Sequence, residues 1–410
     1  MYKKYLTRHL MAMFFTALLI VSFNQPSSFA QMSKTPLTGS DAALMEPIVP
    51  FEMPENYPED IVEYFEEYSF PRSYIVIDDE TNRVLAQREA NTPYPIASMS
   101  KVISTYMAYK AIDEGKISMD TKVKIPKAIE EGISSDPDLS NVGLVAGQEY
   151  TVKDLIYGIM LQSGNDATSA LMWEIYGNEE LAVQAIKDQL AEWGITNIQF
   201  YQTSGAPNQY LPENMWIPGS TEMSENFMSA TDVALMAQHL VHDYPEVLEV
   251  TSAPQYTFAE GTEYERILIN PNELLPGRQY GRENVTGVKS GFTDAAGRNF
   301  VATTTENGRK MTVVVMGLFD ETSDTYWEIA TLLEKLNEHP DLYKNEKLPV
   351  AKHPSDAELA AIAEKEAEEK SKAEETNQTK PKKQDLQERY PNNRDNIITQ
   401  AFDNLFSIFE

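Results

Sequence analysis

Hydrophobic residues follow two different periods along this chain, and the two periods occupy separate stretches. In the acidic segment 57–68 the apolar residues lie three and four positions apart, which predicts a helix with one buried face. Two short runs rich in β-forming residues follow at 74–77 and 84–87, on either side of a polar turn. This arrangement predicts a β-hairpin directly after the first helix.

A long helical block separates this hairpin from the remaining strands. One helix is expected to start at Ser98 and to be closed by Gly115. Residues from about 117 to 245 have mainly helical periodicity, and the segments 151–154 and 229–232 carry N-terminal capping signals. The block therefore predicts several short helices between two groups of strands.

Strand patterns return after this block. The sheet is expected to resume near Tyr256 and Ile267 and to end with strands at 300–305 and 311–317. Asn307-Gly308 between the last two strands is a strong hairpin turn. Strands at both ends of a helical block predict an α/β (α+β) fold, in which helices flank an antiparallel sheet and an all-helical lobe is inserted.

The N-terminal thirty residues have the pattern of a signal peptide. A basic start is followed by a mostly apolar run at 10–23 and by small residues at positions 28 and 30. An uncleaved membrane helix is the alternative, but the run is shorter than the roughly 20 residues that a spanning helix needs. We therefore expect 1–30 to be removed before Gln31 and the protein to be exported.

Three further segments flank or extend the predicted catalytic domain, which we place at 57–345. Residues 31–56 are rich in Pro, Ser and Thr and are expected to form a tether, whereas 346–391 form a charged spacer rich in Ala, Glu and Lys. Apolar residues at steps of three and four predict a short amphipathic helix at 392–410. Its apolar face suits a membrane surface, a protein partner or its own domain.

Composition narrows the chemistry that this chain can carry out. It contains no cysteine, which removes thiol nucleophiles, cysteine metal sites and disulfides. Its net charge of −29 argues against a nucleic-acid partner. None of the five histidines neighbours the motifs described next, so we expect neither a Ser-His-Asp triad nor a metal site, and no cofactor.

The first polar motif is SMSK at 98–101. Residues three apart on a helix share a face, so Ser98 and Lys101 are expected to project into the same space. A buried lysine has a lowered pKa and can act as a base toward a hydroxyl. The start of a helix also favours a developing oxyanion. Alone, such a tetrapeptide often occurs by chance.

The second motif is SGN at 163–165, inside an apolar segment that Gly164 interrupts. Ser163 can relay a proton between the lysine and a leaving amine, and Asn165 can hold a substrate amide. Taken alone, the same residues favour a polar helix start at Asn165 or Asp166 over a catalytic role.

The third motif is KSG at 289–291, which is expected to open the penultimate strand. Lys289 adds positive charge toward a substrate carboxylate, and Ser290 and Thr293 add hydroxyls. Gly291 has no side chain and lets a substrate backbone approach closely. This motif too is weak evidence when it stands alone.

The three motifs together, in this order and on these elements, resemble one enzyme family. The stretch from about 70 to 340 resembles the D-alanyl-D-alanine carboxypeptidases, the low-molecular-mass penicillin-binding proteins of serine peptidase family S11. The segments IASMSK at 96–101, NPNELL at 270–275 and GVKSGFTDAAG at 287–297 support this resemblance. It implies a fold like that of the β-lactamases and penicillin-binding proteins.

The resemblance also implies roles for individual residues. Ser98 would be the acylated nucleophile, Lys101 its base, and Ser163 and Asn165 the proton relay and substrate clamp. Lys289, Ser290 and Thr293 would hold the terminal carboxylate of the peptide, and the backbone N–H groups of Ser98 and Phe292 would form the oxyanion hole. KSG in place of the commoner KTG keeps the hydroxyl.

The implied substrate is a peptidoglycan stem peptide ending in D-Ala-D-Ala, with β-lactams as covalent inhibitors outside the cytoplasm. The chain departs from the family in two respects: too few strand-like residues follow 340 for a second β-rich domain, and the helix at 392–410 is acidic rather than basic. A β-lactamase, a DD-endopeptidase and a catalytically inactive wall-binding protein remain alternatives. The first is disfavoured because no Glu-x-x-Leu-Asn element lies between the second and third motifs.

Overall fold

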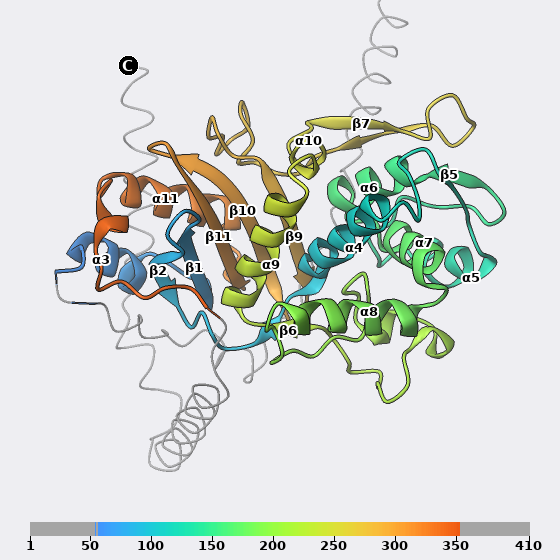
Figure 1. The fold of residues 1–410 in the computed structure, drawn as a ribbon, viewed down its shortest axis with the longest axis horizontal. Helices are drawn as coiled ribbons and strands as arrows, with labels where there is room; N and C mark the ends of the chain where they lie inside the picture. Colours follow the sequence, from blue (N-terminus) through green and yellow to red (C-terminus); the bar gives the residue numbers. More distant parts are fainter. Residues whose placement is uncertain (1–53, 55, 353–410) are drawn as a thin grey trace, which may run out of the picture. The chain divides into compact units, whose positions relative to one another are not determined.

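A five-stranded antiparallel sheet forms the centre of the protein. The computed structural model describes Pro54 and residues 56–352 (Figure 1). The strands lie in the order β2-β1-β11-β10-β9. Their bounds are β1 Ser73–Asp78, β2 Arg83–Arg88, β9 Gly287–Thr293, β10 Gly297–Glu306 and β11 Arg309–Leu318. The first and last strands of the chain are thus neighbours, which confirms the predicted fold class.

The strands of the central sheet pair in a defined antiparallel register. β1 pairs with β11, for example Tyr74 with Val315 and Ile75 with Val314. β10 and β11 are joined by Asn307 and Gly308, both with positive φ, as the predicted hairpin turn requires. Because helices cover both faces of the sheet, consecutive residues such as Val313, Val314 and Val315 are all buried.

Two hydrophobic clusters hold helices on opposite faces of the sheet. Tyr74 and Val76 of β1 pack with α3 (Glu59–Glu67) and α11 (Thr325–Asn337). The alternating residues Ile75 and Ile77 belong to the other cluster, which includes α9 (Ala230–Asp243) and the helical lobe. In Figure 1, α9 crosses the sheet in front of β11. A period of two along β1 therefore separates the two layers of core.

The inserted lobe is helical, as predicted. Its helices are α4 Lys101–Asp113, α5 Lys127–Ile129, a π-helical turn at Glu130–Ser134, α6 Val152–Leu161, α7 Asn165–Tyr176, α8 Glu179–Glu192, α9 and α10 Val247–Thr251. Thr151 and Asp154 form a capping box on α6, and Ser229 caps α9 by accepting from the N–H of Asp232. Both predicted capping signals are confirmed.

Short strands and turns complete the described chain. β3 (Tyr94–Pro95) pairs with β6 (Phe227–Met228), and β4 (Lys122–Lys124) pairs with β5 (Glu149–Thr151). The 3-10 turns lie at Ala97–Ser100, Asn208–Tyr210, Glu213–Met215 and Leu342–Lys344. The β3–β6 pair lies beside the turn that carries the first motif.

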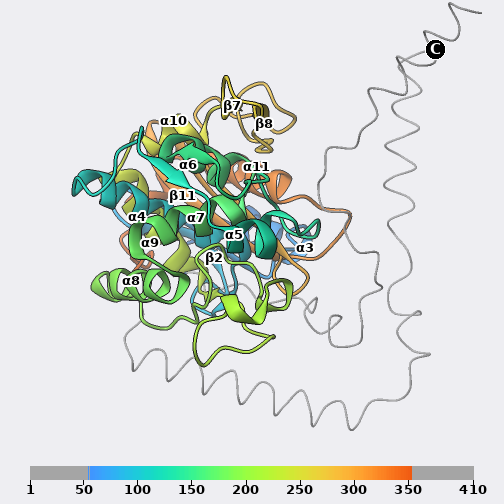
Figure 2. The ribbon, with the colours of Figure 1, turned by 90° about the vertical axis from the view of Figure 1, so that its right-hand side faces the viewer.

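Two expectations about strands were wrong. β7 (Gln255–Phe258) and β8 (Arg266–Ile269) do not rejoin the central sheet but form a separate two-stranded sheet. Ile267 and Ile269 are exposed, so one face of this hairpin meets solvent, while Tyr256 stacks on Tyr157 of α6 at 3.8 Å between ring centres. Figures 1 and 2 both place the hairpin at the top of the described body.

The second error concerns the strand that carries the third motif. The KSG residues lie on β9, and two strands, β10 and β11, follow it, so this strand is third from the end rather than penultimate. β9 also forms an edge of the sheet. An edge strand has backbone groups free to bind an extended peptide.

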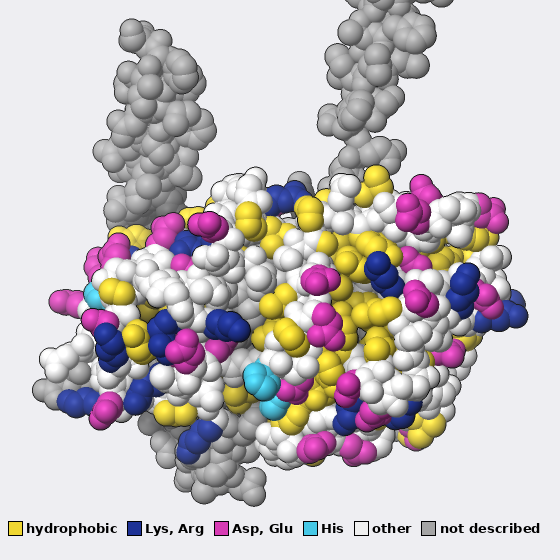
Figure 3. Space-filling view, turned by 45° about the horizontal axis from the view of Figure 1, so that its top comes forward, with side chains coloured by type: hydrophobic (Ala, Val, Ile, Leu, Met, Phe, Trp, Pro, Cys, Tyr) yellow, Lys and Arg dark blue, Asp and Glu magenta, His cyan; other side chains and the backbone are white. Residues whose placement is uncertain are grey.

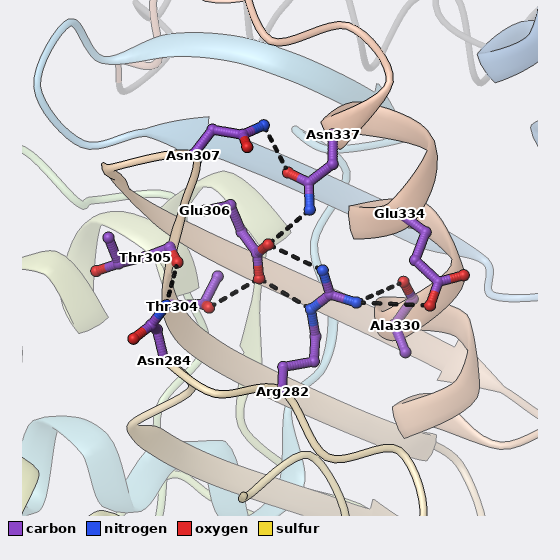
Figure 4. Close-up of polar contacts among 9 residues, drawn as sticks. All are labelled: Arg282, Asn284, Thr304, Thr305, Glu306, Asn307, Ala330, Glu334 and Asn337. Carbon is purple, nitrogen blue, oxygen red and sulfur yellow. Dashed lines mark hydrogen bonds and ion pairs between the residues drawn. The ribbon is translucent and has the colours of Figure 1, made fainter.

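A partly buried ion pair fixes the segment that leads into β9. Arg282 donates through Nε and Nη2 to the two carboxylate oxygens of Glu306, each at 2.8 Å (Figure 4). Asn337 of α11 donates to the same carboxylate at 2.7 Å. A bidentate pair with a further donor is geometrically specific, so the segment before β9 is tied to both β10 and α11.

The ends and the surface of the described body add three observations. Leu348 is buried and the Pro349 carbonyl accepts from the N–H of Val84, so ordered packing continues past the predicted boundary at 345. Acidic and basic side chains are interspersed on the face drawn in Figure 3. Among the described residues, no helix has the length and apolar character to cross a membrane.

The predicted signal peptide at 1–30 and the helix at 392–410 lie outside the described residues, as do nearly all of the tether and most of the spacer.

Candidate active site

The turn that carries Ser98 is held in an uncommon conformation. Ser98 lies in the 3-10 turn Ala97–Ser100, and α4 begins at Lys101 rather than at Ser98 as predicted. Ala97, directly before it, has φ of 48°, which costs a non-glycine residue about 1 kcal/mol or more. The Ser98 side chain remains partly exposed at the start of the helix. Its hydroxyl can therefore be reached by a substrate.

Lys101 is fully buried beneath this turn and is bonded to three oxygens. Its Nζ donates to Ser98 Oγ at 2.8 Å, to Asn165 Oδ1 at 2.8 Å and to the Ser204 carbonyl at 2.7 Å. Burial lowers the pKa of Lys101 well below its usual value, and the positive charge of Lys289 lowers it further. The carboxylate of Asp166 acts in the opposite direction. The amine therefore lies within proton-transfer distance of a hydroxyl.

The second motif supplies one direct partner of this lysine. Asn165 is the first residue of α7, and its backbone N–H and its Nδ2 both donate to the Ser140 carbonyl, at 2.8 and 2.9 Å. Ser163 lies between α6 and α7 with φ of 58°, again a non-glycine residue in the left-handed region. No hydrogen bond of the Ser163 hydroxyl occurs within the described part of the chain.

The third motif approaches the same turn from the sheet. Lys289, Gly291 and Thr293 alternate along β9 and share one face. A methyl group added to Gly291 would lie 2.7 Å from the Ile96 carbonyl oxygen and 3.2 Å from the Ser98 nitrogen. Only glycine permits this approach, so packing against the Ser98 turn requires glycine here. The close approach of a substrate backbone to Gly291 stays a prediction.

The other residues of this motif differ in exposure. Lys289 is buried, its Nζ donates to the Ser290 carbonyl at 3.0 Å, and burial lowers its pKa to about 7. Ser290 is partly exposed and Phe292 is exposed. At neutral pH, Lys289 therefore exists in both charged and neutral forms.

Several residues of the site carry no signal in the sequence. Asn226 accepts at its backbone carbonyl from the N–H of Ile96 at 3.0 Å, and its Nδ2 donates to Ser100 Oγ at 2.9 Å. Gly205 has φ of 77°, and a methyl group there would collide with the Ala97 carbonyl oxygen. These contacts join positions about a hundred residues apart, and no local pattern predicts them.

Two acidic residues were also missed. The buried Asp166 carboxylate accepts from the backbone N–H groups of Val142, Gly143 and Leu144 at 3.0, 2.8 and 2.9 Å. This holds the loop that presents Ser140 to the second motif. The second is Glu225, which accepts a hydrogen bond at 3.1 Å from the hydroxyl of Thr293. The predicted role of Thr293 in substrate binding stays a prediction.

The structure thus brings Ser98, Lys101 and Asn165 into one hydrogen-bonded group, with Lys289 close enough to affect the pKa of Lys101. The described residues hold no group of three or more His, Asp or Glu placed to bind a metal ion. A hydroxyl beside a buried amine can attack an acyl carbon without histidine.

Residues 69–320 match the family described as D-alanyl-D-alanine carboxypeptidase, peptidase S11. The chain belongs to peptidase family S11. All three motifs of this S11 chain lie inside the matched region. The resemblance inferred from the motifs is therefore confirmed.

Two curated relatives show the extent of the similarity. The S11 chain is 30% identical over 251 residues to D-alanyl-D-alanine carboxypeptidase DacC of Escherichia coli (strain K12), covering 60% of this chain and 56% of the relative. It is 28% identical over 249 residues to DacF of Bacillus subtilis (strain 168), covering 60% and 57%. The chain thus spans somewhat more than half the length of these relatives.

Solved structures agree on the fold. A peptidoglycan synthesis regulatory factor (PBP3) from Streptococcus pneumoniae superposes with a TM-score of 0.61 at 32% identity, covering 66% of the S11 chain and 71% of its own. Penicillin binding protein 5 from Haemophilus influenzae gives 0.54 at 27% identity, covering 66% and 70%. The predicted penicillin-binding-protein-like fold is confirmed.

Proposed function

We propose that this protein is a serine-type DD-carboxypeptidase that removes the terminal D-Ala from peptidoglycan stem peptides outside the cytoplasm, with β-lactams as covalent inhibitors. The observation that carries the proposal is the 2.8 Å contact between the buried Lys101 amine, whose pKa is lowered, and the partly exposed Ser98 hydroxyl. Membership of family S11 supports the same activity.

Acylation starts with proton transfer from Ser98 to the neutral amine of Lys101. The Ser98 oxygen attacks the carbonyl carbon of the penultimate D-Ala, and the resulting oxyanion is placed against the backbone N–H groups of Ser98 and Phe292. Ser163 donates its hydroxyl proton to the leaving amine of the last D-Ala as the C–N bond breaks, and it receives in turn the proton held by Lys101. Water then attacks the ester, which releases the shortened peptide and returns the proton to Ser98.

Three features beside Ser98 and Lys101 are proposed to orient the substrate: Asn165, Lys289 with its neighbouring hydroxyls, and the edge of β9. Asn165 Oδ1 bonds Lys101 and fixes its amine, and the same side chain is proposed to hold a substrate amide. Charged Lys289 attracts the terminal carboxylate of the peptide, for which Ser290 and Thr293 offer hydroxyls. The free edge of β9 suits a substrate that binds in an extended conformation.

The test is release of D-alanine from a synthetic stem pentapeptide by the full chain. We expect steady release, and a decrease in kcat by a factor on the order of 10⁴ or more in Ser98→Ala. Ser118→Ala, which changes an exposed serine outside the site, serves as the control. Equal release by Ser98→Ala would refute the assignment of the nucleophile.

The alternatives give different results in the same assay series. Rapid turnover of a chromogenic cephalosporin would indicate a β-lactamase, and cleavage of crosslinked peptide dimers in preference to pentapeptide would indicate an endopeptidase. Binding of pentapeptide without release of D-alanine would indicate an inactive wall-binding protein.

A further inference from the structure

Residues 224–228 contact both the turn that carries Ser98 and strand β9, which carries the third motif. Asn226 bonds the turn that carries Ser98, through Ile96 and Ser100. The neighbouring Glu225 is half-buried, and its carboxylate accepts a hydrogen bond from the hydroxyl of Thr293 on β9. The bonds of Asn226 therefore also fix the position of the neighbouring Glu225 carboxylate. This carboxylate lies beside Thr293, the last residue of β9.

The single hydrogen of the Thr293 hydroxyl is already used in a hydrogen bond. A threonine hydroxyl offers one O–H donor and two acceptor lone pairs. Here the donor is used on Glu225 Oε2 at 3.1 Å, and the oxygen accepts from the N–H of Ala296 at 3.0 Å. A substrate carboxylate can receive the O–H of Thr293 only when Glu225 gives it up.

The negative charge of Glu225 also opposes the binding of a substrate carboxylate at Thr293. Two carboxylates that both approach one hydroxyl lie within about 5–6 Å of each other, a distance at which like charges repel strongly near a protein surface. Asp294, beside Thr293, adds to the negative potential at Glu225. The partly buried Tyr210 also lies within the influence of both carboxylates.

Protonation of Glu225 removes both obstacles. A protonated carboxyl can donate to Thr293 Oγ1, which frees the threonine O–H for the substrate, and it carries no charge. Burial raises the pKa of Glu225, Asp294 raises it further, and the bond from Thr293 opposes them. The neutral form therefore persists to a higher pH than for an exposed glutamate.

We propose that Glu225 is a specificity-determining residue, whose charged form excludes a substrate carboxylate from Thr293 and whose neutral form admits it. This inference rests on the proposed carboxypeptidase function. It means that the preference for a peptide with a free carboxylate over the same peptide with an uncharged end declines as the pH rises.

The experiment compares two probes on the full chain, diacetyl-L-Lys-D-Ala-D-Ala with a free carboxylate and its C-terminal amide. The ratio of kcat/KM for the two probes is measured from pH 5.5 to 8.5 for the wild type, Glu225→Gln and Glu222→Gln. Glu222 is an exposed acid three positions before Glu225 and provides the matched control. Thermal unfolding of each protein establishes that it is folded.

We expect the carboxylate-to-amide ratio of Glu225→Gln to exceed that of the wild type about tenfold at pH 8, and the difference between the two proteins to shrink as the pH falls. Lys289, with a pKa of about 7, titrates in every variant, so the comparison between proteins isolates Glu225. Glu222→Gln should follow the wild type.

Equal ratios in the wild type and Glu225→Gln at every pH, with both proteins turning over substrate, would overturn this inference alone. Failure of all the proteins to cleave the D-Ala–D-Ala bond of either probe, with release of D-alanine or of D-alanine amide, would overturn the proposed function, and this inference with it. If Glu225→Gln is less stable than the wild type, Glu225→Ala must give the same increase in the ratio for the proposal to stand.

Discussion

Replacing Asp166 by Asn should destabilise the loop that supports the catalytic lysine. Asp166 Oδ2 accepts from the N–H groups of Gly143 and Leu144 at 2.8 and 2.9 Å. An asparagine of the same shape puts an NH₂ group where these two donors converge. Hydrogen bonds to charged groups contribute about 1.5–3 kcal/mol each, so the loss of two, after partial relaxation, should cost about 3 kcal/mol.

The same substitution should also slow the reaction of Ser98. The Asp166 loop presents the Ser140 carbonyl to Asn165, and Asn165 bonds Lys101. We therefore expect acylation by benzylpenicillin to slow about tenfold, since a displacement of 1 Å or less at a reacting group has effects of this size or larger.

Chemical denaturation of Asp166→Asn and of the control Asp138→Asn measures the first effect. Asp138 is exposed on the segment that leads into the same loop, so its replacement should change the free energy of unfolding by less than about 0.5 kcal/mol. A loss below about 0.5 kcal/mol in Asp166→Asn would refute the claim that its carboxylate holds the loop.

Two further predictions concern packing and pH. Gly205→Ala should lower the free energy of unfolding by about 3 kcal/mol, because the methyl group would lie 2.6 Å from Ser100 Oγ and collide with the Ala97 carbonyl. Gly147→Ala, at a similar φ with no atom within 4 Å, should cost only about 1 kcal/mol in the same denaturation experiment. Acylation by benzylpenicillin should rise as Lys101 loses its proton and fall above about pH 7, where Lys289 loses the charge that attracts the drug's carboxylate. Lys289→Met should weaken the falling limb, and an identical profile in that variant would contradict the role of Lys289.

Local patterns in the sequence predict much of this fold. The β1–β2 hairpin, the capping box at Thr151 and the turn at Asn307-Gly308 each depend on residues a few positions apart, and all three are present. The β7–β8 pair was misassigned because alternation predicts a strand but not the sheet to which the strand belongs. In the structure Ile267 and Ile269 are exposed, so only one face of this hairpin is buried, whereas both faces of the central sheet are covered.

The candidate site divides in a similar way. Ser98 and Lys101 lie three positions apart where the 3-10 turn leads into α4, so their contact follows from helical spacing. Contacts of Asn226 with Ser100 and of Glu225 with Thr293 depend on how distant loops pack, which no local pattern specifies. Thr293 illustrates the limit: its place on β9 follows from the motif, but its bond to an acid could be found only in the structure.

The most direct test of the central claim is the mass of the full chain after treatment with benzylpenicillin, followed by peptide mapping. A nucleophilic Ser98 predicts one adduct with the full mass of the drug, located on the peptide that contains Ser98 and abolished by Ser98→Ala. An unchanged mass, or an adduct on another residue, would contradict the claim that the Lys101 amine activates the Ser98 hydroxyl.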